Sequence, residues 1–214
     1  MQRTRIKICG VRDEQTALVA AACGADAIGL VFVRSSPRFV EPADAWHIVD
    51  ALPPFVTAVG LFVDPPFDTY DDARDACPFT YTQLHGKESE PDVRDMGPDV
   101  IKGIRYDPST IEADLLKWSR HDDVCAVLVD GGPGGTGETL DWKHLASVKH
   151  LCDHPLILAG GLTPENVGEA IRAVRPFAVD VSSGVESQRG VKDPAKVAAF
   201  CKAVREADHQ LAST

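Results

Sequence analysis

Short apolar runs alternate along this chain with longer amphipathic stretches, and the same two-part unit recurs eight times. The apolar runs predict strands at residues 5–10, 27–33, 56–63, 80–84, 100–104, 126–130, 156–159 and 178–182. The stretches between them predict helices at residues 14–23, 43–52, 67–76, 90–96, 109–120, 142–150, 164–174 and 194–207, several of them opened by Asp, Ser, Thr or Pro. Strict alternation of strand and helix is typical of a parallel sheet that is buried on both faces.

Eight such units favour a closed barrel over an open sheet. Their spacing of roughly 25 residues predicts a single-domain α/β protein, an eight-stranded parallel (β/α)₈ TIM barrel that occupies residues 1–214. The alternative is an open doubly wound sheet, but the first strand is not followed by the G-x-G-x-x-G loop of a dinucleotide site. Because such barrels carry their functional residues at the carboxyl ends of the strands, the residues where each run stops are the candidates for chemistry.

Composition and charge narrow the classes of partner. With 44% hydrophobic and 25% charged residues the chain is an ordinary globular protein, and no apolar run is long enough to span a membrane. The start of the chain leads directly into the first strand without a signal peptide, so we expect a cytoplasmic protein. A net charge of -10 without a cluster of Lys and Arg argues against nucleic acid as a partner. Six scattered cysteines with no C-x-x-C pair predict neither disulfides nor a metal site.

The most informative stretch follows the sixth predicted strand. The run ends on a single carboxylate, Asp130, and five glycines lie within the next seven residues, Gly135 among them. Glycines allow backbone N–H groups to approach a ligand closely, which is how neutral protein holds a phosphate. A mobile surface loop is the alternative interpretation. The carboxylate at the end of a buried strand favours a binding site that includes Gly135.

The first strand carries a lysine and a thiol on one face. With a period of two, Lys7 and Cys9 point to the same side, which in a barrel is the interior. An isolated cysteine more often packs as a small apolar side chain, but Cys9 stands at the functional end of its strand. Since the first and last strands are neighbours in a closed barrel, Asp180 is the predicted partner of Lys7. Lys7 is expected to favour the thiolate and so to lower the pKa of Cys9.

Glycines and hydroxyl groups end the seventh and eighth strands. Gly160 and Gly161 follow one strand, and Ser183 and Gly184 follow the other. The loops after these two strands are where this fold most often binds a phosphate, through backbone N–H groups and a helix N-terminus. Glycines required only for tight turns are the alternative. We therefore predict a phosphate site at these four residues.

Two further strand ends carry polar candidates. Arg38 follows the second strand and can form a two-pronged contact with a carboxylate, although a loop arginine is often only a solvated charge. Gln83 and His85 lie on one face at the end of the fourth strand, where a structural histidine is the more ordinary interpretation. All three are candidate substrate contacts.

Taken in order, these motifs resemble the phosphoribosylanthranilate isomerase family of tryptophan biosynthesis, and the resemblance spans nearly the full length of the chain. The motifs that carry it are Lys7-Ile-Cys9-Gly10, Gly24-Ala-Asp-Ala-Ile-Gly29, Ser36-Pro37-Arg38, Gln83-Leu-His85-Gly86, Asp130 with Gly134-Gly135-Thr136-Gly137 and Asp141-Trp142, Leu158-Ala-Gly-Gly-Leu162-Thr-Pro-Glu-Asn166-Val, and Asp180-Val-Ser-Ser-Gly-Val-Glu186. Each motif is weak alone, but their order and spacing around eight strands are specific. Only three residues separate Asp130 from Gly134, a shorter loop than the family often has.

The resemblance implies an Amadori rearrangement of N-(5-phosphoribosyl)anthranilate to 1-(2-carboxyphenylamino)-1-deoxyribulose 5-phosphate, without metal or organic cofactor. It makes Cys9 the general base and Asp130 the general acid. It places Arg38 on the anthranilate carboxylate and the loops at 160–161 and 183–184 on the phosphate. The remaining candidate substrate contacts are Gln83, His85 and Gly135, with Lys7 and Asp180 in support. We expect a monomer or a homodimer.

The chemistry of the rearrangement matches these residue types. Ring opening needs a proton delivered to the ring oxygen, and the resulting iminium makes the C2′ proton acidic enough for a side-chain base to remove. The histidine-pathway isomerase, which runs the same reaction on a substrate with two phosphates, is the nearest alternative. It uses an aspartate on the first strand, where this chain has Cys9, and this chain has Arg105 rather than a carboxylate at the end of the fifth strand. A barrel that binds a phosphorylated metabolite without catalysis is the second alternative, but the acid and base positions are both occupied.

Overall fold

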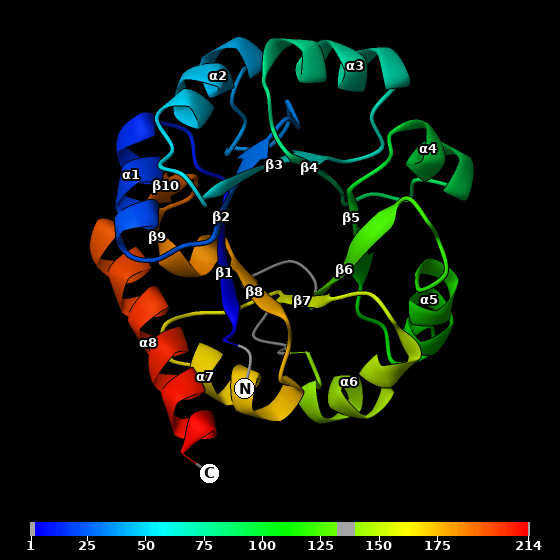
Figure 1. The fold of residues 1–214 in the computed structure, drawn as a ribbon, viewed down its shortest axis with the longest axis vertical. Helices are drawn as coiled ribbons and strands as arrows, with labels where there is room; N and C mark the ends of the chain where they lie inside the picture. The colour runs from blue at the N-terminus through cyan, green and yellow to red at the C-terminus, as the bar shows by residue number, and fades with distance from the viewer. Residues whose placement is uncertain (1–2, 132–139, 214) are drawn as a thin grey trace.

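The computed structural model describes residues 3–131 and 140–213, and within them the strands close into a parallel barrel in the order β1 to β8. Figure 1 looks along this barrel and shows the ring of strands with the helices outside it. The strands are β1 (Arg5–Cys9), β2 (Ala27–Val31), β3 (Thr57–Phe62), β4 (Tyr81–Leu84), β5 (Val100–Arg105), β6 (Val124–Asp130), β7 (Leu156–Ala159) and β8 (Ala178–Val181). The predicted fold is therefore confirmed.

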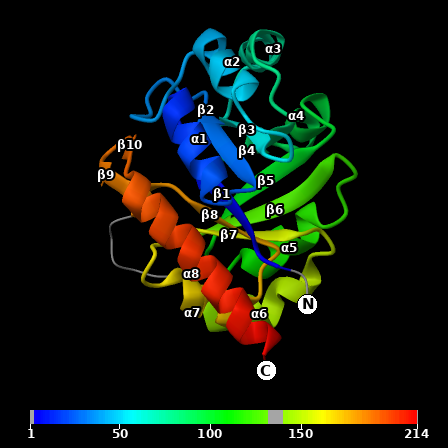
Figure 2. The ribbon, with the colours of Figure 1, turned by 60° about the vertical axis from the view of Figure 1, so that its left-hand side comes forward.

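The eight predicted helices are present among the described residues; the third has the predicted ends, and each of the other seven is shifted at one end or both. They are α1 (Glu14–Ala22), α2 (Pro42–Asp50), α3 (Phe67–Ala76), α4 (Glu90–Asp95), α5 (Ile111–Trp118), α6 (Trp142–Val148), α7 (Val167–Val174) and α8 (Pro194–Ala212). Helix α7 begins three residues after the predicted Pro164, because Asn166 accepts a hydrogen bond from the N–H of Thr163 and closes a turn ahead of the helix. Helix α8 runs five residues beyond its predicted end and packs against α1 and α7 (Figure 2).

Successive side chains along each strand point alternately out of and into the barrel, which produces two separate apolar cores. Outward-facing residues such as Ile8 and Leu30 pack against the helices, while a smaller cluster fills the inside of the barrel: Val59, Ile101, Ala126, Leu128, Ile157, Ala159 and Ala178. The same inward register continues to the carboxyl end of each strand. There it presents Cys9 on β1, Asp130 on β6 and Asp180 on β8 to the interior. The barrel thus explains why chemically active residues separated in sequence meet at one end.

The short segment between β8 and α8 forms a turn and a hairpin that were not predicted. After β8 the chain makes a short 3-10 turn, η2 (Ser183–Val185), and then an antiparallel pair formed by β9 (Glu186–Gln188) and β10 (Val191–Lys192). This hairpin precedes α8 and lies near the segment that leaves β2 (Figures 1 and 2). Its strands are too short and too polar to give the apolar alternation by which strands are recognised in a sequence.

None of the helices within residues 3–131 and 140–213 combines the length and the apolar character that crossing a membrane requires. All six cysteines lie within the described residues, and all six are free thiols.

Candidate active site

A single cavity opens at the carboxyl ends of the strands and collects most of the predicted site residues. Its lining includes Arg38 after β2, His85 after β4, Asp130 on β6, Gly160 and Gly161 after β7, and Ser183 after β8. Gly135, with the rest of the glycine-rich stretch at 132–139, lies outside the described residues. The site residues that the structure describes therefore converge from five loops or strand ends on one side of the barrel.

The predicted contact between Lys7 and Asp180 is present. The two residues are direct neighbours across β1 and β8, and the Lys7 Nζ lies 2.7 Å from Asp180 Oδ1. Both side chains are at least nine-tenths buried, so the pair is screened little by solvent. Cys9 is two residues along the same face of β1 and only 5% exposed. A buried cation and a buried thiol thus lie beside each other; their neighbour Asp180 lines the cavity, whereas Lys7 and Cys9 are not among its lining residues.

The predicted effect of this environment on Cys9 was wrong in its net direction. Burial raises the pKa of the Cys9 thiol, and this cost of placing a charge in an apolar interior outweighs the lowering by the ammonium groups of Lys7 and Lys192. The carboxylate of Asp180 also acts against the thiolate. In the free protein the thiol therefore holds its proton at neutral pH.

Gly29 on β2 makes room for the side chains of Lys7 and Cys9. It is the strand neighbour of Cys9, and a Cβ at this position would lie 2.8 Å from Cys9 Sγ and 3.0 Å from Lys7 Nζ. We expect Gly29→Ala to lower kcat at least about tenfold, because displacing a reacting group by about an ångström is costly. Steady-state kinetics would measure this. Gly168→Ala is the matched control, since its Cβ would meet the end of the Arg172 side chain at 3.3 Å and Ala207 Cβ at 3.9 Å, and alanine favours the helix. An active Gly29→Ala variant would contradict the tight placement of Cys9.

Asp130 is held by a histidine that sequence analysis had assigned to the substrate. The Nε2 of His85 lies 3.2 Å from Asp130 Oδ2, and its Nδ1 lies 2.9 Å from Nε2 of Gln83. With Gln83 donating to Nδ1, the histidine carries its proton on Nε2 and donates it to the carboxylate. Gln83 is buried, so it reaches the cavity only through His85. Asp130 and His85 remain partly exposed to the cavity.

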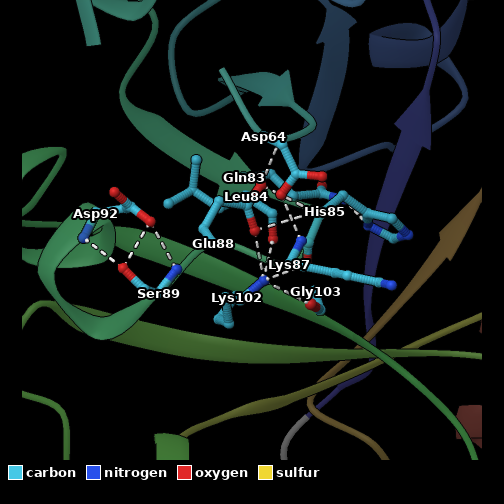
Figure 3. Close-up of polar contacts among 11 residues, drawn as sticks. Asp64, Gln83, Leu84, His85, Lys87, Glu88, Ser89, Asp92, Lys102 and Gly103 are labelled. Atoms are coloured by element: carbon cyan, nitrogen blue, oxygen red, sulfur yellow. Dashed lines mark hydrogen bonds and ion pairs between the residues drawn. The ribbon is translucent and has the colours of Figure 1, made fainter. Parts of the chain in front are cut away.

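The loop that carries His85 is fixed from below by a buried ion pair, which Figure 3 shows in detail. The Lys102 Nζ lies 2.7 Å from Glu88 Oε2, and both side chains are almost completely buried. The backbone N–H groups of Asp64 and Gly86 donate to Glu88 Oε1 at 3.0 and 2.9 Å. Burial alone would raise the pKa of Glu88, but the hydrogen bond and charge of Lys102 hold it below its usual range.

The loops after β7 and β8 touch one another and leave no space for a side chain at Gly160 or Gly184, whereas the space beside Gly161 is open. A Cβ on Gly184 would overlap the carbonyl of Leu162, and Gly160 and Gly161 both have positive φ, at 89° and 64°. Gly161 and Ser183 are exposed to the cavity. Because Ser183 and Gly184 begin the η2 turn, their N–H groups have no acceptor within it. The phosphate site predicted at these residues stays a prediction.

Arg38 also lies at the cavity, but it is already engaged. Its Nε and Nη2 donate to the two carboxylate oxygens of Glu186 at 2.7 and 2.9 Å. Lys192 Nζ lies 2.8 Å from the same carboxylate. Sequence analysis missed Glu186 and Lys192 as parts of the site, as it missed Glu88 and Lys102. No local pattern marks them, although Glu186 closes one of the quoted motifs.

With this geometry established, the chain can be compared with known proteins. A family model described as N-(5'-phosphoribosyl)anthranilate isomerase matches residues 6–203. A relative of that name from Pseudomonas fluorescens is 46% identical over 213 residues, which cover 99% of this chain and 100% of the relative. This chain belongs to the phosphoribosylanthranilate isomerase family. The predicted resemblance is confirmed, and the chain is an aldose–ketose isomerase of tryptophan biosynthesis.

Solved structures agree with this family assignment. The phosphoribosylanthranilate isomerase of Thermotoga maritima superposes with a TM-score of 0.87 at 37% identity and covers 95% of this chain and 99% of its own. In a second structure, a phosphoribosylanthranilate isomerase is bound to reduced 1-(o-carboxyphenylamino)-1-deoxyribulose 5-phosphate. It superposes with a TM-score of 0.84 at 36% identity, again over 95% of this chain and 99% of its own.

Proposed function

We propose that this chain converts N-(5'-phosphoribosyl)anthranilate into 1-(2-carboxyphenylamino)-1-deoxyribulose 5-phosphate by general acid–base catalysis, with Asp130 as the acid and Cys9 as the base. The observation that carries this proposal is the presence at one end of the barrel of a carboxyl group, a thiol beside a lysine and the glycine-bearing loops after β7 and β8. The ligand of the family member crystallised with a reduced form of that product supports the same substrate class.

The first step opens the ribose ring. Asp130 donates its proton to the ring oxygen, and the C1′–O bond breaks with its electron pair moving to that oxygen. The lone pair of the anthranilate nitrogen forms the C1′=N bond at the same time. His85, which donates to Asp130 Oδ2, keeps the carboxyl in place and stabilises the carboxylate that remains.

The second step moves the double bond. The Cys9 thiolate removes the C2′ proton, the C–H electron pair forms a C1′=C2′ bond, and the C=N electron pair returns to nitrogen. Protonation at C1′ and loss of the 2′-hydroxyl proton then give the ketone, and these transfers return both side chains to their starting states. The Lys7 ammonium lies beside the thiolate during this step and offsets part of the cost of its burial.

The anionic ends of the substrate have separate anchors in this proposal. The backbone N–H groups around Gly161, Ser183 and Gly184 hold the phosphate, as helix and loop N-termini hold anions elsewhere. Arg38 binds the carboxylate of the aromatic ring. Gly135 is proposed as a further contact from the glycine-rich stretch. Fixing both ends of the substrate places C1′ and C2′ between acid and base.

The proposal includes neither metal nor organic cofactor, because one acid and one base complete the reaction. It also includes a cytoplasmic location, which six free cysteines favour since reducing compartments keep thiols unpaired. A monomer or a homodimer is proposed as the working state. One solved relative, from Thermotoga maritima, is described as dimeric with monomers generated from it.

The direct test is turnover by the purified protein. Phosphoribosylanthranilate is generated in situ, its fluorescence loss is followed, and the product is identified by mass and by reduction with borohydride. We expect catalysed conversion of this substrate and no turnover of the two-phosphate substrate of the histidine pathway. A protein that binds the reduced product but converts nothing would contradict the proposal and favour the non-catalytic barrel.

The raised pKa of Cys9 predicts the alkaline side of the pH profile. The productive form carries a proton on the acid and none on the thiol. Because carboxyls in unfolded chains titrate near ~3.9 and thiols near ~8.5, this form is a minor tautomer of the singly protonated site. Its share stays constant until the thiol titrates and falls above that pH. We therefore expect kcat/KM to decline only above the ordinary thiol range of about 8.5. An earlier decline would contradict a thiol of raised pKa as the base.

A further inference from the structure

The side chain of Arg38 is fixed on two sides. Its guanidinium donates two hydrogen bonds to Glu186, and its methylene stem lies directly over Gly10. Gly10 has a φ of +80°, and a Cβ there would lie 2.5 Å from Arg38 Cδ. A long arginine side chain normally samples many rotamers, and ordering it on binding costs affinity. Here the ordering is built into the protein.

The carboxylate that holds Arg38 belongs to the β9–β10 hairpin. Glu186 opens β9, and its Oε2 accepts the N–H of Gly190 at 3.1 Å within the hairpin. Gly190 in turn packs against the carbonyl of Pro37, where a Cβ would lie at 2.6 Å. The hairpin therefore docks on the residue before Arg38 as well as on its guanidinium, in agreement with its position in Figure 1.

The charges around Glu186 leave a net positive site. Burial would raise the pKa of Glu186, but the hydrogen bonds from Arg38 and Lys192 lower it to about 2. Glu186 is therefore an anion at every working pH. With Arg38 and Lys192 both beside it, two cations face one anion. The remaining positive charge is available to an anionic ligand in the cavity.

A guanidinium has two edges that can each bind a carboxylate. Glu186 takes the edge formed by Nε and Nη2 of Arg38. Among the residues that the structure describes, Nη1 donates no hydrogen bond, and Arg38 lines the cavity. We infer that Glu186 is a positioning residue for substrate recognition: it holds Arg38 so that the Nη1–Nη2 edge faces the carboxylate on the aromatic ring. This inference rests on the proposed function, which assigns that carboxylate to Arg38.

Binding of two stable product analogues tests the inference. One is 1-(2-carboxyphenylamino)-1-deoxyribitol 5-phosphate, and the other is the same molecule without the carboxylate. We expect the unchanged protein to bind the first about 10- to 100-fold more tightly, as charged hydrogen bonds provide. Glu186→Gln should bring this preference close to one and leave the second analogue unaffected. The reason is that the amide NH₂ of glutamine would face two donors, Arg38 Nη2 and the N–H of Gly190.

Matched variants separate positioning from general damage. Glu41→Gln removes the negative charge paired with Arg34 in an exposed arginine–glutamate pair at 2.8 Å, and it should leave the preference intact. Glu186→Asp keeps the negative charge on a shorter side chain. Its preference for the carboxylate-bearing analogue should lie between those of the unchanged protein and Glu186→Gln, and this measurement tests the inference if the glutamine variant does not fold. A glutamine variant that keeps the full preference, or that weakens both analogues equally, would overturn the inference. Unchanged protein that binds both analogues equally would overturn the assignment of Arg38 as well.

Discussion

Asp130→Asn is expected to lower kcat by about 10²- to 10⁴-fold, the usual contribution of a positioned proton donor. Asparagine has the same shape, and its side-chain oxygen can still accept the hydrogen bond from His85 Nε2, so the fold and the cavity should be preserved. What it loses is the acidic proton that ring opening needs. Cys9→Ser should have a loss of similar size, because a serine hydroxyl is far too weak an acid to supply a base at neutral pH. Single-turnover kinetics with phosphoribosylanthranilate would measure both effects.

The control for Asp130 is an aspartate at the rim of the same cavity. Asp107 lines the cavity and is exposed, and its carboxylate accepts hydrogen bonds from the N–H and hydroxyl of Ser109 within its own loop. Asp107→Asn should leave kcat within about twofold. If it reduced turnover as strongly as Asp130→Asn, the cause would be the general field of the cavity and the assigned acid would be wrong.

A variant that combines Cys9→Ser with Asp130→Asn tests whether the two groups act on the same reaction. When acid and base act on one reaction coordinate, removing both costs much less than the product of the single losses, because either loss alone already removes the catalysed route. We expect Cys9→Ser combined with Asp130→Asn to be about as slow as the slower single variant. The phosphate and carboxylate contacts would still bind the substrate in all three, so KM should change less than kcat.

The barrel and the positions of the proposed acid and base follow from local features of the sequence. Period-two alternation on β1 places Lys7 and Cys9 on one face, and a closed barrel makes β8 the neighbour of β1. These two facts lead to the Lys7–Asp180 pair without any distance information. Glycines at the ends of β7 and β8 mark the proposed phosphate site in the same way, because at Gly160 and Gly184 only glycine fits against the neighbouring backbone.

The parts of the site that sequence analysis missed depend on tertiary contacts. Arg38 and Glu186 are 148 positions apart, and neither lies in a strand ladder that would bring them together by register. The pKa of Cys9 was predicted in the wrong direction for a related reason. A sequence shows that a lysine is near but does not show how completely the thiol is removed from water, and here burial is the larger effect.

The β4–α4 loop shows how such hidden contacts support catalysis. Lys102 comes from the middle of β5, where an apolar side chain would normally stand, and its ammonium lies within 3.3 Å of four oxygens: Leu84 O, Gly86 O, Glu88 Oε2 and Gly103 O. Figure 3 shows these contacts directly beneath the loop that carries His85. A buried lysine is thus the inner support for the histidine that holds the acid.

Lys102→Met is therefore expected to lower the free energy of unfolding by about 3–5 kcal/mol, since it leaves the buried Glu88 carboxylate without its cation. Denaturant unfolding would measure the loss. Any folded variant should also have a reduced kcat, because the loop that presents His85 to Asp130 loses its anchor. The matched control is Lys202→Met, which breaks an exposed pair with Glu206 at 3.6 Å and should change stability by less than about 0.5 kcal/mol.

A double variant separates the charge from the hydrogen bonds. In Glu88→Gln with Lys102→Met, the glutamine oxygen can still accept the N–H groups of Asp64 and Gly86, while no buried charge remains. We expect it to recover part of the stability that Lys102→Met loses, because the largest cost of the single variant is the unpaired carboxylate. Full recovery is not expected, since the carbonyls that Lys102 contacts would lose their donor. A double variant less stable than Lys102→Met would show that the hydrogen bonds of Glu88, rather than its charge, dominate this support.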